Sequence, residues 1–288
     1  MNLKTLIPWH AKIAAKLVLS RIPAAYAFWH RFDLFSHGLM DRPDYAIGVF
    51  SSHYDRTDFE RKGHGFVAME FGPGDSALSA VIAQAYGATS CYLVDAGGYA
   101  THDVGLYRHT ATLLSDRALA RSNLADATTF DEVLQRCHAQ YLTEGLASLR
   151  TLPSQSVDFM WSQAVLEHVR RDDFLPVMKE LRRILRPNGA CSHTVDLKDH
   201  LGGGLNNMRI SSRWWEREWM ANSGFYTNRL RLSEMLDLFQ QAGFKADLIG
   251  VDKWDRLPVR NSALAREFRH LTDSDLLVKE FDVLLRAA

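Results

Sequence analysis

The chain has 288 residues, of which 47% are hydrophobic and 24% are charged, and its formal net charge is zero. Such values are ordinary for a globular protein and exclude a disordered or fibrous one. Because there is no net positive field to attract nucleic acid, we expect no nucleic-acid partner. The three cysteines, Cys91, Cys137 and Cys191, show no CxxC spacing. This excludes the usual zinc and disulfide frameworks and predicts no metal site.

Residues 1–34 are basic, with three lysines and two arginines against a single acid, Asp33. These cations interrupt each apolar run, so neither a membrane-spanning helix nor a signal peptide is predicted, and we expect a cytoplasmic protein. Ile13 and Leu17 lie on one side of a short helix that ends before Pro23. This helix either packs on the core or lies on the anionic surface of the inner membrane face. We interpret residues 1–65 as an N-terminal helical cap and approach segment.

The stretch FVAMEFGPGDSALSAVIAQAYGATSCYLVDAGG, residues 66–98, is typical of a strand, a helix and a second strand. Asp75 or Ser76 is expected to cap the start of the helix, and Gly87 is expected to follow its end. Four apolar residues recur at the spacing of one helical face: Leu78, Val81, Ile82 and Ala85.

Strand and helix patterns alternate through the rest of the chain. Strands are predicted at 139–145, 156–163 and 190–197, after a helix-prone insert at 100–138. A helix over 174–185 is expected to stop at 187–189, and a helix from Ser233 to Gly243 follows a segment at 201–231. Two β-like runs, 245–251 and 276–285, have no long helix between them, which predicts an antiparallel pair at one edge. The alternation predicts an α/β fold with a doubly wound, mostly parallel sheet.

The glycine-rich turn after the first strand is the main functional signal. Ligands of doubly wound sheets bind beyond the carboxyl ends of the strands, where glycine lets the backbone approach them. Gly72 and Gly74 fit this need, and with Asp95 they also match a dinucleotide site, so an NAD(P)-dependent oxidoreductase is one interpretation. Glu70 and Asp75, however, add carboxylates to the turn. Because carboxylates disfavour phosphate and favour a cation, the turn fits the sulfonium nucleoside S-adenosylmethionine better.

Four motifs in order, MEFGPGDS, YLVDAG, SVDFMWSQAVLEHV and LRRILRPNGA, resemble those of the class I S-adenosylmethionine-dependent methyltransferases. The resemblance covers residues 66–288, with inserts near 100–138 and 201–231. It implies a Rossmann-like sheet of seven strands with an antiparallel last strand, and S-adenosylmethionine as cofactor. Glu144 stands in place of the aspartate that the family commonly carries after the third strand. The cofactor-binding residues so implied are Glu70, Gly72, Gly74, Asp75, Asp95, Glu144, Ser162 and Gln163.

Two histidines at the expected ligand edge are candidate catalytic bases. His168 follows the fourth strand, and His200 follows the fifth strand in TVDLKDH. Imidazole titrates near neutral pH, so either ring is suited to accept a proton from a hydroxyl acceptor. Asp196 or Asp199 would orient His200. In the alternative interpretation, His168 only orders its loop and the acids near His200 form a solvated loop.

The segment 201–231 is rich in glycine and tryptophan and is placed to cover the site. Aromatic side chains with polar partners suit a sugar ring or a lipid-linked acceptor. The predicted substrate-binding residues are Trp214, Trp215, Asn228, Arg229 and Arg231. Alternatively, the tryptophans pack an inserted helix on the core and the arginines are solvated.

These observations predict a methyltransferase that modifies a hydroxyl on a small molecule or glycan, including a membrane-linked sugar, with peripheral membrane contact through residues 1–34. The nicotinamide-dependent oxidoreductase is the rival enzyme class. A third interpretation is a cofactor-binding subunit without catalytic activity.

Overall fold

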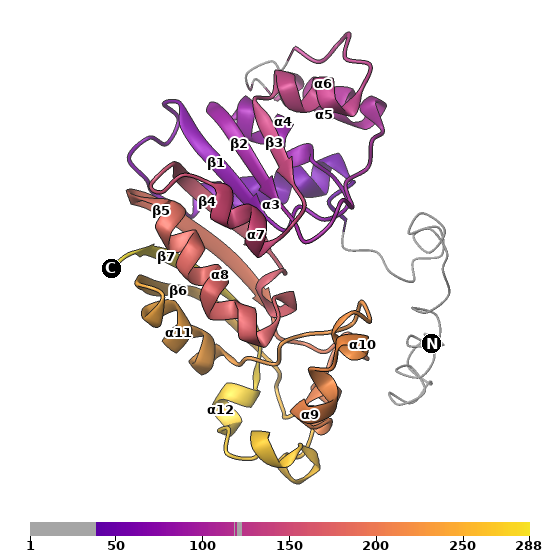
Figure 1. Ribbon diagram of the computed structural model, residues 1–288, viewed down its shortest axis with the longest axis vertical. Helices are drawn as coiled ribbons and strands as arrows, with labels where there is room; N and C mark the ends of the chain where they lie inside the picture. The colour runs from indigo at the N-terminus through magenta and orange to yellow at the C-terminus, as the bar shows by residue number, and fades with distance from the viewer. Residues whose placement is uncertain (1–38, 118, 120–122) are drawn as a thin grey trace.

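The computed structural model describes residues 39–117, 119 and 123–288 and contains one seven-stranded sheet (Figure 1). The strand order is β3-β2-β1-β4-β5-β7-β6. The strands β1 to β5 are parallel, and β7 runs antiparallel to both of its neighbours. Their bounds are β1 Phe66–Phe71, β2 Ala88–Val94, β3 Ala139–Leu142, β4 Val157–Gln163, β5 Leu185–Asp196, β6 Phe244–Lys253 and β7 Val278–Ala287. The predicted doubly wound α/β sheet and its antiparallel final strand are confirmed.

The first β-α-β unit forms where the sequence predicts it. Helix α4, Leu78–Ala85, buries all four residues of its predicted apolar face, and Gly87 follows it with φ of +93°. The residue before α4 is Ala77, whose side chain forms no cap, but the Leu78 N–H at the start of the helix donates to Ser76 Oγ at 3.4 Å. The hydroxyl of Ser76 donates in turn to the carbonyl of Met40.

Helices cover both faces of the sheet. Helix α3, Pro43–Asp55, packs with α4 and α5, Val104–Asp116, on one face, where Phe50, Val81 and Phe159 share a core cluster. Helices α7, Leu146–Thr151, α8, Arg171–Ile184, and α11, Leu232–Gln241, cover the other face over Met160. Figure 1 shows α8 and α11 in front of the sheet and α3 behind it. The insert 100–138 holds α5 and a shorter helix, α6, Phe130–Arg136.

Two predicted boundaries are wrong. Helix α8 ends at Ile184 and β5 begins at once at Leu185, so residues 187–189 belong to an irregular start of the strand rather than to a turn. Helix α11 starts at Leu232, one residue before the predicted cap. The hydroxyl of Ser233 lies 2.8 Å from Asp275 Oδ2 and bonds to this carboxylate of a distant segment.

The carboxyl-terminal part adds short helices below the sheet in Figure 1. The segment 201–231 contains η3 Asn206–Arg209, α9 Ser212–Trp215 and α10 Glu218–Ala221, and the segment between β6 and β7 contains η4 Asn261–Ala263, η5 Arg266–Phe268 and α12 Asp273–Leu276. The two segments pack on each other through an apolar cluster that includes Met208, Val259 and Phe268.

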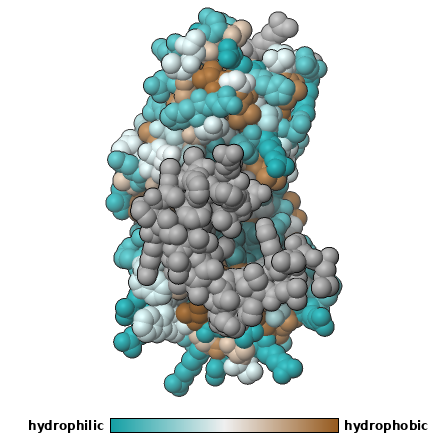
Figure 2. All heavy atoms as spheres, turned by 90° about the vertical axis from the view of Figure 1, so that its right-hand side faces the viewer, coloured by the Kyte–Doolittle hydropathy of each residue, from teal (hydrophilic) through white to brown (hydrophobic). Residues whose placement is uncertain are grey.

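No helix among the described residues is long and apolar enough to cross a membrane. On the face drawn in Figure 2, hydrophilic and hydrophobic residues alternate over the described surface. The predicted helix near residues 13–17 and the basic segment 1–34 lie outside the described residues.

Candidate active site

The carboxyl ends of the parallel strands bring the predicted motifs to one edge of the sheet. Strand β1 lies between β2 and β4, so the glycine turn after Phe71 is flanked by Asp95 on one side and by the loop after Gln163 on the other. This edge is where ligands bind in doubly wound sheets.

Asp95 ties the glycine turn to the end of β2. Its Oδ2 accepts a hydrogen bond of 2.9 Å from the Gly74 N–H, and its Oδ1 accepts one of 2.7 Å from Ala96. Gly72 and Gly74 have φ of +79° and +66°, a left-handed conformation that favours glycine. The carboxylate fixes the turn and, because each oxygen has two lone pairs, keeps acceptor capacity for a ligand hydroxyl.

The close approach at Gly72 differs from the expected one. A Cβ built on Gly72 would lie 2.5 Å from Cγ2 of Val165, the residue before the 3-10 helix η2, Leu166–His168. Glycine is therefore required here so that the loop after β4 can pack on the turn. The position that a Gly72 side chain would occupy is thus filled by Val165.

Glu70 is a buried carboxylate at the base of the turn. It is 1% exposed, and its Oε1 accepts a hydrogen bond of 3.2 Å from Trp161 Nε1. Burial is the main cause that raises the pKa of Glu70 to about 7, and the nearby Asp95 carboxylate raises it further. When Glu70 is ionised, it and Asp95 only accept hydrogen bonds, which fits a ligand with an ammonium group and hydroxyls and disfavours phosphate.

Residues 69–192 match a family model described as a methyltransferase domain. The match supports the class I S-adenosylmethionine-dependent methyltransferase family for this chain. S-adenosylmethionine is thus its cofactor, and the dinucleotide alternative is not favoured. The match spans the glycine turn, Asp95 and the whole of β4, which are the parts of this methyltransferase that meet at the edge just described.

Solved structures of methyltransferases are similar to the chain at low identity. One is the Burkholderia thailandensis 1,6-didemethyltoxoflavin-N1-methyltransferase with S-adenosylhomocysteine, at 13% identity over 98% of this chain and 91% of the other, with a TM-score of 0.46. A SAM-dependent methyltransferase of Methanosarcina mazei has 16% identity over 77% and 92%, with a TM-score of 0.44. The mitomycin 7-O-methyltransferase has 15% identity over 99% and 70%, with a TM-score of 0.44. No curated protein is matched by the sequence.

The remaining predicted cofactor residues differ in exposure and in hydrogen bonding. Glu144 is exposed just beyond β3, at the same edge. Asp75 is buried in the turn. Ser162 is fully buried with its Oγ 2.7 Å from His193 Nδ1, and Gln163 Oε1 lies 3.1 Å from His53 Nε2. The last two side chains bond within the sheet layers, which does not support their predicted contact with the cofactor.

His168 has the geometry of a base. It is exposed at the end of η2, and its Nδ1 lies 2.9 Å from the carbonyl oxygen of Tyr226. Because a carbonyl only accepts, Nδ1 carries the proton, and in the neutral ring Nε2 holds the lone pair. The bond therefore fixes the tautomer in which Nε2 accepts a proton.

The second candidate base lies against the first. The His168 and His200 rings stack with their centroids 4.9 Å apart, and both are exposed. Asp199 does not orient His200, since its carboxylate accepts the N–H groups of Leu201, Gly204 and Asn206 and so folds the loop around itself. Asp196 pairs with Lys198 at 3.1 Å.

Four of the five predicted substrate residues are buried and bonded within the methyltransferase. Trp215 is 0% exposed, and its Nε1 donates to the Thr227 carbonyl at 2.7 Å. Asn228 donates to the carbonyls of Leu166 and Val169, and both arginines bond to backbone carbonyls, Arg229 to that of Ile210 and Arg231 to those of Leu197 and Val278. This placement corrects their expected role, because they anchor the insert on η2 and β7. Only Trp214, 50% exposed, is available to an acceptor.

Sequence reasoning missed a buried polar chain that joins α3 to the sheet. His53 Nδ1 lies 2.7 Å from Ser192 Oγ, while its Nε2 meets Gln163. Burial lowers the pKa of His53 to about 4 and that of His193 to about 3. The His53 side chain is 0% exposed beneath β4 and β5. Its helical spacing with the buried Val49 and Phe50 was the available signal.

Proposed function

We propose that this methyltransferase transfers the methyl group to a hydroxyl of a small molecule or glycan, with His168 as general base. The observation that carries the proposal is the 2.9 Å contact from His168 Nδ1 to the Tyr226 carbonyl, because it presents Nε2 as an acceptor at the ligand edge. Nitrogen acceptors with a free lone pair have less need of such a base. The stacked His200 ring holds His168 in place from one side.

We assign cofactor roles to residues of the glycine turn and its neighbours. The Asp95 carboxylate would accept the ribose hydroxyls, Glu70 would balance the ammonium group, and Glu144 would accept from the adenine amino group. When bound, the cofactor would supply a methyl group on a sulfonium sulfur; a carbon–oxygen bond to the acceptor would form as the carbon–sulfur bond breaks, leaving the thioether S-adenosylhomocysteine. Nε2 of His168 takes the hydroxyl proton, so the product is a methyl ether and the proton leaves the ring to solvent.

The test compares His168→Asn, His200→Asn and the control His109→Asn, which lies exposed on α5. Asparagine keeps a donor near the Tyr226 carbonyl but supplies no base. S-adenosylhomocysteine formation is measured with sugars, sugar phosphates, phenols and amines as acceptors over a range of pH. We expect His168→Asn to lower turnover on a hydroxyl acceptor by roughly 10²-fold or more while cofactor affinity is unchanged. Full turnover in that variant, or transfer only to amines, would refute O-methylation with this base.

The acceptor proposal extends to membrane-linked sugars at the cytoplasmic face. It is supported by Trp214 and Trp219, which are 50% and 38% exposed on the short helices of the insert, and by Arg217 over the Trp214 ring at 4.7 Å. Tryptophan and arginine are typical of membrane–water interfaces. Vesicle sedimentation of the double variant Trp214→Ser, Trp219→Ser measures this contact, and equal sedimentation of both proteins would exclude it.

A further inference from the structure

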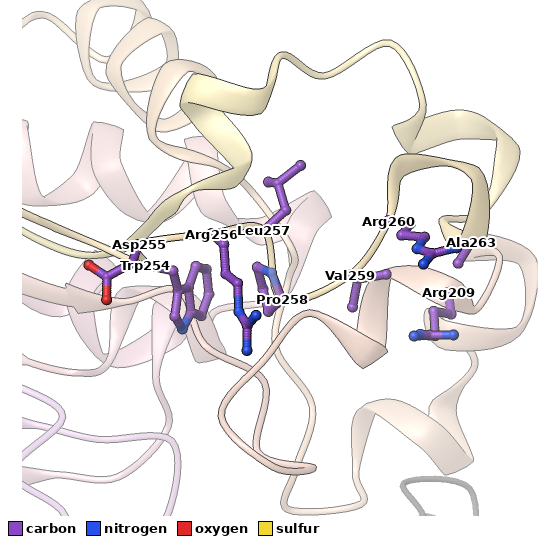
Figure 3. A pocket seen from close by; sticks show the side chains of 9 residues that line it. All are labelled: Arg209, Trp254, Asp255, Arg256, Leu257, Pro258, Val259, Arg260 and Ala263. Atoms are coloured by element: carbon purple, nitrogen blue, oxygen red, sulfur yellow. The ribbon is translucent and has the colours of Figure 1, made fainter.

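A surface groove of about 820 Å³ lies between the 205–209 turn and the segment that follows β6 (Figure 3). Its walls include three arginines, Arg209, Arg256 and Arg260, together with Trp254 and Pro258. In Figure 3 the Arg256 side chain extends beside Trp254 and Pro258, and Arg209 and Arg260 lie toward the other end. The groove also contains one acid, Asp255, so its lining has a net positive charge.

Two of the three arginines in the groove have no partner among the residues that the structure describes. Arg256 and Arg260 are exposed, and neither guanidinium forms a hydrogen bond or ion pair with any residue that the structure describes. Most arginines elsewhere in this fold are paired, as Arg170 is with Glu218 at 2.6 Å and Arg286 with Asp247 at 3.0 Å. Each unpaired guanidinium fork matches the geometry of phosphate, so the groove offers an oxyanion a contact at Arg256 and another at Arg260.

The groove adjoins the loop that carries the second histidine. A Cβ built on Gly204 would lie 3.6 Å from Pro258 Cβ in the groove wall and 3.7 Å from Asp199 Oδ2, next to His200. The wall is rigid, because Val259 and Met208 are buried in one apolar cluster and the Ala265 N–H donates to the Met208 carbonyl at 2.9 Å. A ligand held in the groove is thus fixed relative to the His200 loop.

We propose that this groove binds the phosphate of a phosphorylated acceptor, with Arg256 on the phosphate and the neighbouring Trp254 against a sugar ring. The inference deepens the proposed function and rests on it for the identity of the ligand as acceptor. The flat Trp254 side chain, half-buried in the wall, provides the ring contact that a free phosphate lacks. The same phosphate chemistry occurs in a soluble sugar phosphate and in a lipid headgroup.

The experiment titrates the full chain by calorimetry at low ionic strength with inorganic phosphate, glucose 1-phosphate and glucose. We expect saturable binding of both phosphates, tighter for glucose 1-phosphate, and none of glucose. Arg256→Gln should weaken binding roughly tenfold, and Arg260→Gln, toward the other end of the groove, should weaken it less. The matched control Arg266→Gln removes an exposed cation from the same segment but outside the groove and should leave binding unchanged. Trp254→Leu should weaken only glucose 1-phosphate.

Vesicles of phosphatidylcholine with and without phosphatidylglycerol distinguish the two sources. Saturable binding of glucose 1-phosphate without vesicle binding supports a soluble acceptor. Binding to anionic vesicles that is lost in Arg256→Gln but not in Arg266→Gln supports a headgroup. The proposal is overturned if neither source binds, or if Arg266→Gln weakens binding as much as the groove variants. Cofactor binding is measured separately with S-adenosylhomocysteine. It tests the proposed function independently of ligand binding in the groove.

Discussion

Val165 of the loop after β4 lies directly over the α-carbon of Gly72 in the glycine turn, where a Cβ would be 2.5 Å from its Cγ2. The turn and the loop that leads to His168 are therefore packed as one unit. This contact connects the cofactor motif to the candidate base, and a substitution on either side is expected to affect both.

Gly72→Ala is predicted to destabilise the protein by about 2 to 4 kcal/mol, since it combines a left-handed backbone with overpacking against Val165. Urea denaturation measures the free energy of unfolding. Adding Val165→Ala should relieve the clash and recover part of the lost stability. The remaining loss should reflect the cost of alanine in the left-handed backbone conformation. An unchanged stability in Gly72→Ala would contradict the contact.

The affinity for S-adenosylhomocysteine should depend on pH through Glu70. With a pKa of about 7 in the free protein, this carboxyl is largely protonated at pH 6, and the ligand's ammonium group prefers the ionised form. Binding should weaken as pH falls below 7, by up to about tenfold per pH unit, and level off above it. Calorimetry at several pH values measures this. Glu70→Gln should abolish the pH dependence of the affinity. If the variant keeps the full pH dependence, another group is responsible for it.

Acid should destabilise the fold through the buried histidines. The pKa of folded His53 is about 4, whereas unfolded imidazole has a pKa near 6.5, so below pH 6.5 only the unfolded chain takes the proton. The stability present above pH 6.5 is then lost as pH falls to about 4, and His53 alone contributes about 3 kcal/mol of this loss. Urea denaturation of His53→Gln should show a shallower slope between these pH values. His109→Gln is the matched control, and an equal slope in all three proteins would refute the assignment.

The two adjacent tryptophans of α9 should respond differently to truncation. Trp215→Ala is expected to cost about 3 to 5 kcal/mol because it removes a fully buried ring. Trp214→Ala, at a position that is 50% exposed, should change stability by less than about 0.5 kcal/mol. Thermal and urea denaturation compare the two, and similar losses would contradict the placement of the insert.

Arg231 is predicted to be a structural residue rather than an acceptor contact. It is 1% exposed and donates to the carbonyls of Leu197, Asp275 and Val278. Arg231→Gln leaves these carbonyls without their cationic donor and should destabilise the protein by about 3 kcal/mol or more. The exposed Arg108→Gln on α5 is the control. Native stability with a raised KM for the acceptor would instead restore the original interpretation.

The order of motifs was sufficient to predict the sheet and the ligand edge, because glycine, Asp95 and the strand patterns are local signals. The packing of side chains from distant segments was not predictable. Nothing near Gly72 in the sequence indicates Val165, and nothing in α3 indicates that His53 reaches Ser192 of β5. The sequence does not distinguish the neighbouring Trp214 and Trp215. Only the tertiary structure shows that Trp215 is buried and that Trp214 is exposed. Asn228, Arg229 and Arg231 were misassigned for the same reason, since polar side chains in a loop suggest a ligand until their partners are known.

The position of β7 between β5 and β6 also determines when β6 can join the sheet during synthesis. During synthesis β6 emerges first and has no neighbour in the sheet until β7 follows it from the ribosome. Strand β6 therefore joins the sheet only after β7 has been synthesised. We expect a ribosome-bound chain stalled before Val278 to be sensitive to proteases in β6 and α11, while the unit around β1, β2 and β4 is already protected.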